Sequence, residues 1–325
     1  MRFGVYPGGR AGTTCSHPAD PAAIEELVDE LAGGRPLLIR EYVHFFGAGP
    51  DPGTVASLGA EHELDRLPMP DEWYTRGGRE LDLVVSYLPA TADLPGWLAF
   101  LDTVIDRYGR LTRYLQVTLE PNFPLPLIDG SSPGVFEALT VGLPYARTAL
   151  NRRGLDHVRV GFSVAEPAEW LGGDDAFWQR LADLPPDVFA THVDYVGLGL
   201  YPDAFAPVAP GDIAALTAHA IDHLRDHCLP RAHIPATVPM HIAENGSPSV
   251  PPRSEADQAR SLSDMIGTVL DRSTAANITR YELFSLRDAD SGSAEALGGL
   301  GLVSDTYHRK EAFAVFRDVI ARHGR

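Results

Sequence analysis

Two glutamates stand where carboxylate chemistry is readily done, each at the end of a run of strand-forming residues. Glu120 closes the run QVTLE and precedes a proline, and Glu244 closes the run HIAE and precedes the turn residues NG. A carboxylate at the end of a buried strand is costly to place unless it is used. Two carboxylates on either side of one sugar are the chemical core of glycosidic-bond hydrolysis. We therefore predict that Glu120 and Glu244 form a working pair.

Alternating strand-like and helix-like segments would bring these two residues together. Short segments rich in Val, Ile, Leu and Tyr indicate strands buried on both faces, at residues 2–6, 36–42, 81–87, 113–119, 158–164, 195–201, 238–243 and 278–284. Amphipathic runs indicate helices at residues 21–31, 95–108, 133–153, 174–184, 211–226, 255–272 and 310–322. In residues 43–79 the helical pattern is weak, and we expect a long loop with a short helix. The alternation predicts a single (β/α)8 barrel, the TIM-barrel fold, spanning residues 1–325 as one domain.

Both glutamates fall at the carboxyl ends of expected strands, the fourth and the seventh. This is the end of such a barrel at which active sites lie. Because successive side chains of a strand alternate between its faces, Gln116 and Thr118 should point to the same side as Glu120. The same rule, applied from an inward Glu244, turns His241 toward the helices as a structural histidine.

The charge of the chain excludes two classes of partner. The 325 residues carry a formal net charge of −17, with a pI near 5.0, which repels nucleic acid and anionic membranes. No apolar run approaches the roughly 20 residues needed to cross a bilayer. Because residues 2–6 already have the pattern of a strand, we expect no secretory leader. We expect a cytoplasmic protein in which Cys15 and Cys228 are free thiols.

Neither a metal nor an organic cofactor is expected from the motifs. The His, Asp and Glu residues show no ligand spacing such as His-Glu-x-x-His. The glycine pairs lack the context of a phosphate-binding loop and indicate turns. Lys310 is the only lysine and lies near no expected strand end, which excludes Schiff-base chemistry.

Three C-terminal segments carry a resemblance to a known family. The segment IAENG at 242–246 resembles the nucleophile segment Ile-Thr-Glu-Asn-Gly of glycoside hydrolase family 1, FSLRD at 284–288 resembles its strand-eight motif Trp-Ser-Leu-Leu-Asp, and GLVSD at 301–305 resembles its C-terminal end. The chain thus resembles clan A, the superfamily of (β/α)8 retaining glycosidases. The resemblance implies that Glu120 is the acid/base and Glu244 the nucleophile. It implies a retaining glycosidase or transglycosylase for a small or modified glycoside, with a carbohydrate ligand.

Further residues are expected to contact the sugar. The resemblance matches Arg40 to a recurrent active-site arginine of the clan and Tyr201 to the tyrosine that bonds the nucleophile, and Asn245 and Asp288 lie within the matching motifs. Position near expected strand ends adds the remaining candidates, which are Tyr42, His44, Asn122 and Trp170. The aromatic side chains that could stack on a sugar face are Tyr42, Trp73, Tyr74, Phe123 and Trp170.

Two positions depart from the clan pattern and leave alternatives open. Leu119 stands where an asparagine normally contacts the sugar 2-hydroxyl, and Phe284 replaces the strand-eight tryptophan. These changes motivate a second hypothesis, a silent or repurposed barrel that binds a sugar-bearing metabolite. Glu166, in the segment AEP after the fifth expected strand, competes with Glu120 as the acid/base. We favour Glu120 because the strand count places it after strand four.

Overall fold

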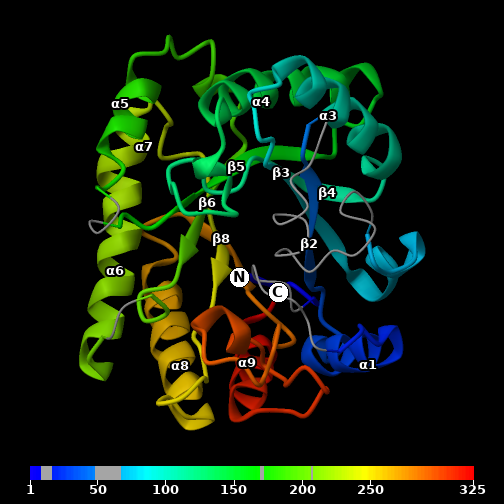
Figure 1. The fold of residues 1–325 in the computed structure, drawn as a ribbon, viewed down its shortest axis with the longest axis vertical. Coiled ribbons are helices and arrows are strands. Elements are labelled where there is room, and N and C mark those ends of the chain that lie inside the picture. The colour runs from blue at the N-terminus through cyan, green and yellow to red at the C-terminus, as the bar shows by residue number, and fades with distance from the viewer. Residues whose placement is uncertain (9–16, 48–66, 169–171, 206–207) are drawn as a thin grey trace.

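Eight parallel strands close into one barrel in chain order. The computed structural model describes residues 1–8, 17–47, 67–168, 172–205 and 208–325. The strands are β1 Arg2–Val5, β2 Leu38–Phe45, β3 Glu80–Tyr87, β4 Thr112–Val117, β5 Arg159–Ala165, β6 Tyr195–Leu200, β7 Met240–Asn245 and β8 Ile278–Leu283. Each strand pairs with the next, and β8 pairs with β1 (Figure 1). The predicted (β/α)8 TIM barrel is confirmed.

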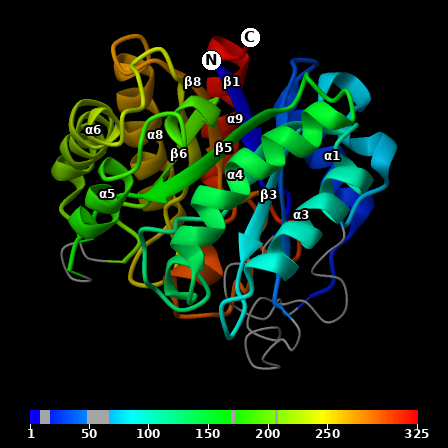
Figure 2. The same ribbon diagram turned by 90° about the horizontal axis from the view of Figure 1, so that it is seen from above.

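Helices surround the barrel on its outer side (Figure 2). They are α1 Pro21–Ala32, α3 Leu94–Tyr108, α4 Val135–Arg152, α5 Asp175–Ala182, α6 Ile213–His223, α7 Leu229–Arg231, α8 Glu255–Arg272 and α9 Glu311–His323. Side-chain caps begin several of them: Asp20 accepts two backbone hydrogen bonds before α1, and Ser254 forms a capping box with Asp257 before α8. Among the described helices, none is both long and apolar enough to cross a membrane.

The stretch expected to hold a loop and a short helix, residues 43–79, is only partly described. It begins with the end of β2 and finishes with two short 3₁₀ helices, η1 Asp71–Tyr74 and η2 Arg76–Gly78. Residues 48–66 lie outside the described residues. The described part therefore agrees with a loop that carries short helical turns.

The two sides of the barrel wall bury different kinds of side chain. Between strands and helices lies an apolar layer that includes fully buried side chains such as Trp97, Trp178, Phe162 and Phe313. Burial of each such side chain stabilises the fold by roughly 1.5–3 kcal/mol. The buried polar residues, by contrast, include Arg40, Asp82, Gln116, His241 and Glu282. Because buried polar groups need partners, each constrains where its neighbours lie.

The placement of His241 corrects the expectation that it faces the helices. Its ring stacks on Tyr195 with centroids 4.3 Å apart, and it meets Tyr114 edge-on at 5.1 Å. A nitrogen of the ring lies near Asp82 and Glu282 on β3 and β8, which places the ring inside the barrel. Strict alternation fails because the pairing of β7 with β8 is irregular between Ile242 and Asn245. This irregularity lets His241 and Glu244, three residues apart, share one side of the strand.

Candidate active site

The carboxylate of Glu244 is held by three donors, two from β2 and one from the residue that follows β6. Its Oε1 accepts hydrogen bonds from Tyr42 Oη at 2.6 Å and Arg40 Nη2 at 3.2 Å. Its Oε2 accepts a hydrogen bond from Tyr201 Oη at 2.9 Å. Burial raises the pKa of Tyr42 and of Tyr201 well above the usual value, so both hydroxyls stay protonated and donate. Three donors around one carboxylate stabilise its negative charge and fix its orientation.

Arg40 links this carboxylate to the interior of the barrel. The side chain is fully buried, and its Nη2 also donates to Gln116 Oε1 at 2.9 Å. Its Nε donates to Tyr42 Oη at 2.6 Å, so the guanidinium orients a second donor of the site. Its Nη1 lies 3.6 Å from Asp82 Oδ2. The planar, permanently charged guanidinium thereby connects β2, β3, β4 and β7 at one point.

Glu120 lies on a turn that the backbone makes immediately after β4. Thr118 and Glu120 have φ values of 67° and 48°, in the left-handed region that side chains other than glycine seldom adopt. A residue that the sequence reasoning missed, Asp129, supports this turn. Its Oδ2 accepts from the backbone amides of Leu119 and Tyr87, both at 2.7 Å. The strained conformation is thus held by a buried carboxylate, as is common at functional sites.

The carboxyl group of Glu120 lies against the backbone of β6 beside Glu244. A Cβ built on Gly199 would overlap Oε1 of Glu120 and come within 3.1 Å of its carboxyl carbon. Gly199 is itself the register partner of Glu244 between β6 and β7. The absence of a side chain at Gly199 therefore makes room for Glu120 next to the strand that carries Glu244. Sequence reasoning had no signal for this role of Gly199.

The two glutamates occupy different electrostatic environments. Glu120 is 5% exposed, and burial, followed by the charge of Glu244, raises its pKa well above the usual range. The charge of Arg40 acts in the opposite direction but does not cancel these effects. Glu244 is surrounded by donors, as described above. One carboxyl group held protonated beside one held by cationic and hydroxyl donors is the arrangement expected of an acid and a nucleophile.

Aromatic side chains line the region around Glu244. Tyr6 stacks on Phe284 with centroids 4.9 Å apart, and Tyr42 meets Tyr6 edge-on at 4.9 Å. His44 stacks on Tyr42 at 6.4 Å, which places this expected residue beside the same cluster. Leu300 packs against the cluster from the loop after β8. Tyr6 and Leu300 were not predicted, although Tyr6 directly follows β1 and could have been found by its strand-end position.

A second group of aromatic side chains extends from Tyr201 toward the protein surface. Tyr201 meets Phe205 edge-on at 6.1 Å, and Phe205 in turn lies 6.4 Å from Phe123. Phe205 is 41% exposed, whereas Phe123 is buried. An exposed aromatic ring next to a residue that bonds Glu244 suits a platform for the outer part of a ligand.

Some expected contact residues are engaged elsewhere. Asn122 Nδ2 donates to Ala165 O and Asp174 Oδ2, and its Oδ1 accepts from the Ala165 amide. Its amide group thus ties the loop after β4 to the end of β5. Asn245 Nδ2 donates to Leu200 O and Met265 Sδ, so this side chain points toward α8 and away from the barrel interior.

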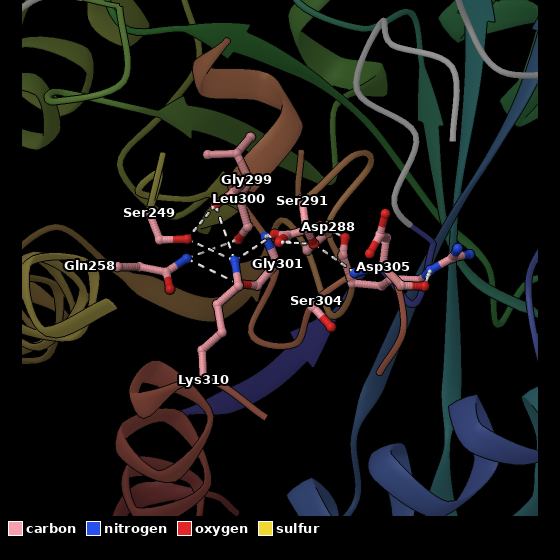
Figure 3. A network of polar contacts seen from close by, with 12 residues as sticks. Ser249, Gln258, Asp288, Ser291, Gly299, Leu300, Gly301, Ser304, Asp305 and Lys310 are labelled. Carbon is pink, nitrogen blue, oxygen red and sulfur yellow. Dashed lines mark hydrogen bonds and ion pairs between the residues drawn. The ribbon is translucent and has the colours of Figure 1, made fainter. Parts of the chain in front are cut away.

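Asp288 lies in the loop after β8, within a network of polar contacts (Figure 3). Its Oδ1 accepts from Lys310 Nζ at 2.6 Å and from the Gly301 amide at 2.8 Å. Lys310 Nζ also donates to Ser249 Oγ at 2.8 Å in the loop after β7. The only lysine of the chain therefore joins two loops to the start of α9, and Asp288 orients these loops.

The remaining aromatic candidates do not enter the region around Glu244. Trp73 is 3% exposed and packs in the apolar core, with the guanidinium of Arg79 4.5 Å from its ring centroid. Tyr74 is buried in the same core and donates to Glu41 Oε1. The expectation that these two rings stack on a sugar was wrong, because both pack outside the barrel wall. Trp170 lies outside the described residues.

Glu166 lies near the site from the end of β5. Its Oε1 accepts from the Tyr201 amide at 2.9 Å, and burial raises its pKa to about 7. Its charge also contributes to the raised pKa of Glu120. Glu166 therefore stays a competing candidate for the acid/base and needs its own variant in any test.

Comparisons with known proteins show which fold this is. No family model and no curated protein sequence matches the chain. Among solved structures, a family 1 β-glucosidase from Exiguobacterium antarcticum B7 has a TM-score of 0.64 and 14% identity, over 99% of this chain and 97% of that one. A β-glucosidase from Thermotoga maritima in complex with deoxynojirimycin has a TM-score of 0.60 and 13% identity, over 94% of this chain and 86% of that one. This chain has the barrel fold of these glycosidases.

A β-glucuronidase from Bifidobacterium dentium, complexed with coumarin-3-O-glucuronide, is also similar. Its TM-score is 0.61 and its identity 12%, over 98% of this chain and 46% of that one. The likeness thus extends across glycosidases that act on different sugars. At such identities it shows the fold, and the choice of sugar rests on the residues of this chain.

Proposed function

We propose that this protein is a retaining glycosidase or transglycosylase that acts on a small or modified glycoside. The observation that carries the proposal is that Arg40, Tyr42 and Tyr201 all donate hydrogen bonds to the Glu244 carboxylate. Next to it lies the carboxyl group of Glu120, whose pKa is raised by burial. The glycosidase fold of the chain agrees with it.

The proposed reaction proceeds in two steps. Glu244 attacks the anomeric carbon while Glu120 donates its proton to the leaving oxygen, and a covalent glycosyl ester forms on Glu244. Glu120, now ionised, takes a proton from water or from a second sugar, which attacks the ester and releases Glu244. Two inversions give net retention of configuration. This mechanism expects the two carboxyl groups about 5–5.5 Å apart.

The direct test is turnover of a panel of aryl glycosides, with the anomer of the first-formed product read by NMR. Retention of configuration supports the proposal. Release of the opposite anomer would refute the retaining mechanism. Binding of a sugar without turnover of any substrate would favour the second hypothesis, a silent sugar-binding barrel, which Leu119 and Phe284 motivate.

The structure sharpens an expectation about Leu119. An asparagine at this place would contact the sugar 2-hydroxyl, a contact that contributes several kcal/mol in the transition state. The neighbouring amides are already engaged: Gln116 Nε2 donates to Thr118 O and Ser163 Oγ, and the amide of Asn122 is held by Ala165. We therefore expect weak discrimination between a glycoside and its 2-deoxy analogue, and poor activity on unsubstituted glucosides.

The measurement is kcat/KM on matched 2-hydroxy and 2-deoxy aryl glycosides. A preference below about 10³-fold, roughly 4 kcal/mol, is expected. A larger preference would mean that another group has taken over the contact, and the inference from Leu119 would fall.

The raised pKa of Glu120 predicts the pH dependence of activity. Glu120 must be protonated to act as the acid, so activity is present below its pKa and is lost as the pH rises through that pKa. The groups that set it come from several elements: burial and the charges of Glu244, Glu166 and Asp129 raise it, and Arg40 lowers it. We expect the alkaline limb of kcat/KM to lie well above the ordinary range of a glutamate. A substrate with a good leaving group needs no acid and should lack this limb, whereas the same limb on both substrates would contradict the assignment.

A further inference from the structure

Three buried side chains from distant strands meet inside the barrel. Asp82 on β3, His241 on β7 and Glu282 on β8 each offer a ligand atom, and these atoms lie within 4.8 Å of one another. The three side chains are 0%, 1% and 0% exposed. Through Arg40, this cluster touches the proposed catalytic centre, because the guanidinium that bonds Glu244 lies 3.6 Å from Asp82.

Five polar atoms of this cluster lack hydrogen-bond partners among the residues that the structure describes. Within the described part of the chain, both oxygens of Asp82, both oxygens of Glu282 and Nδ1 of His241 are buried without a donor or acceptor. Each such atom costs about 1–3 kcal/mol when it is left unsatisfied. The carboxyl groups of Asp82 and Glu282 lie close enough to share one proton, but that proton would join only one oxygen of each. His241 Nδ1 and the other two carboxyl oxygens would still have no hydrogen-bond partner among the described residues.

The charge of the barrel interior also favours a cation. Asp82, Glu244 and Glu282 all act on the one buried guanidinium of Arg40. Arg280, whose guanidinium donates to Tyr114 Oη and to the backbone oxygen of Thr279, adds a second positive charge that acts on Asp82 and Glu282. The three carboxylates still outnumber these two guanidiniums when all are ionised. A bound cation would offset this negative excess.

We propose that Asp82, His241 and Glu282 bind one divalent transition-metal ion, Zn²⁺ or Mn²⁺, inside the barrel beneath the two proposed catalytic glutamates. One imidazole and two carboxylates form a donor set that suits these ions. The backbone leaves room for it: a Cβ on Gly4 would lie 2.8 Å from Glu282 Cγ, so glycine lets this side chain lie inside the barrel. Tyr195, whose ring stacks on His241, adds a buried hydroxyl that has no hydrogen-bond partner in the described part of the chain.

The ion would stabilise the fold from within. A site assembled from β3, β7 and β8 exists only in the folded chain, so binding free energy adds to the free energy of unfolding. It would also fix Asp82 and hence the Arg40 that orients Glu244. Metal content and thermal stability are readouts independent of turnover, so failure of this inference is distinguishable from failure of the proposed function.

The test uses the full-length protein, stripped with a chelator and then dialysed against Zn²⁺ or Mn²⁺. We expect about one equivalent of one of the two ions by elemental analysis, and a Tm that rises by several degrees as metal saturates the site. His241→Gln and Asp82→Asn should each lower the affinity by about 10-fold or more. A folded wild type that binds neither ion and shows no shift in Tm overturns the proposal, whatever the variants do.

A surface site must be separated from the internal one. His219, His223 and His227 follow one another along α6 and the turn after it, with ring centroids 6.1 and 5.8 Å apart, and could bind the same ions. His223→Ala is therefore the matched control. The proposal expects the bound equivalent to persist in His223→Ala and to be lost in His241→Gln. The reverse pattern would assign the metal to the surface and overturn the internal site.

Discussion

Replacing Glu244 by glutamine should abolish turnover of any cleavable glycoside. The amide cannot attack the anomeric carbon, so we expect kcat/KM to fall by at least about 10⁴-fold, or about 5.4 kcal/mol in transition-state stabilisation. The glutamine can keep the same three hydrogen-bond partners. Its oxygen can accept from Tyr42 and Arg40, and its NH2 can donate to the Tyr201 oxygen. The measurement is steady-state kinetics of wild type and variant on an aryl glycoside.

The control is the folded state of the variant. Far-UV circular dichroism and Tm should stay close to wild type, so that loss of activity reports the chemistry. Intact-protein mass spectrometry with a slow 2-deoxy-2-fluoro glycoside adds a second readout: the wild type should gain one glycosyl group on Glu244. A variant that retains more than about a tenth of the activity would exclude Glu244 as the nucleophile.

Replacing Glu120 by alanine should give a loss that an external nucleophile partly reverses. An acid/base contributes about 10²–10⁴-fold, so kcat on a substrate with a poor leaving group should fall by that amount. With a good leaving group the first step needs no acid, and the glycosyl ester on Glu244 accumulates. Azide needs no base, and removal of the side chain leaves space beside Gly199, where the carboxyl group lies. We expect azide to raise kcat about tenfold or more and to yield a glycosyl azide with the configuration of the substrate.

Glu166→Ala is the matched comparison for this experiment. Glu166 is also a glutamate with a raised pKa near Tyr201, but its carboxylate is tied to the Tyr201 amide. We expect this variant to lose less activity and to gain nothing from azide. Azide rescue of Glu166→Ala, without rescue of Glu120→Ala, would transfer the acid/base role to Glu166.

The fold could be predicted from the sequence because its signals are local. A buried parallel strand is a short run of Val, Ile, Leu and Tyr, and an amphipathic helix repeats its apolar residues at helical spacing. A chain with eight such alternations of strand and helix commonly folds into one closed arrangement, the (β/α)8 barrel. The expected strands agree with those of the structure to within a few residues, and the glutamates at strand ends follow from the same pattern. Arg40, Tyr42 and Tyr201 were also expected near the site, and the structure brings all three to Glu244.

Local signals fail where the backbone departs from regular geometry. The alternation rule placed His241 among the helices, but the irregular pairing in β7 turns it inward with Glu244. Likewise, Thr118 and Glu120 adopt left-handed backbone conformations that shape the turn after β4. Neither residue type indicates such a conformation in the sequence. The support from Asp129 and the space above Gly199 depend on segments that are distant in the chain.

The sequence by itself determined the barrel, the strand-end position of the two glutamates and the acidic character of the chain, because each depends on periodicity or composition alone. Only the tertiary structure decided which polar side chains meet. It moved Asn245 toward α8 and Asp288 into a network that orients loops, and it gathered Asp82, His241 and Glu282 at one point. The reason is physical: closure of the barrel places strands β3, β7 and β8 around one interior, and a contact between residues so far apart in the chain leaves no local pattern.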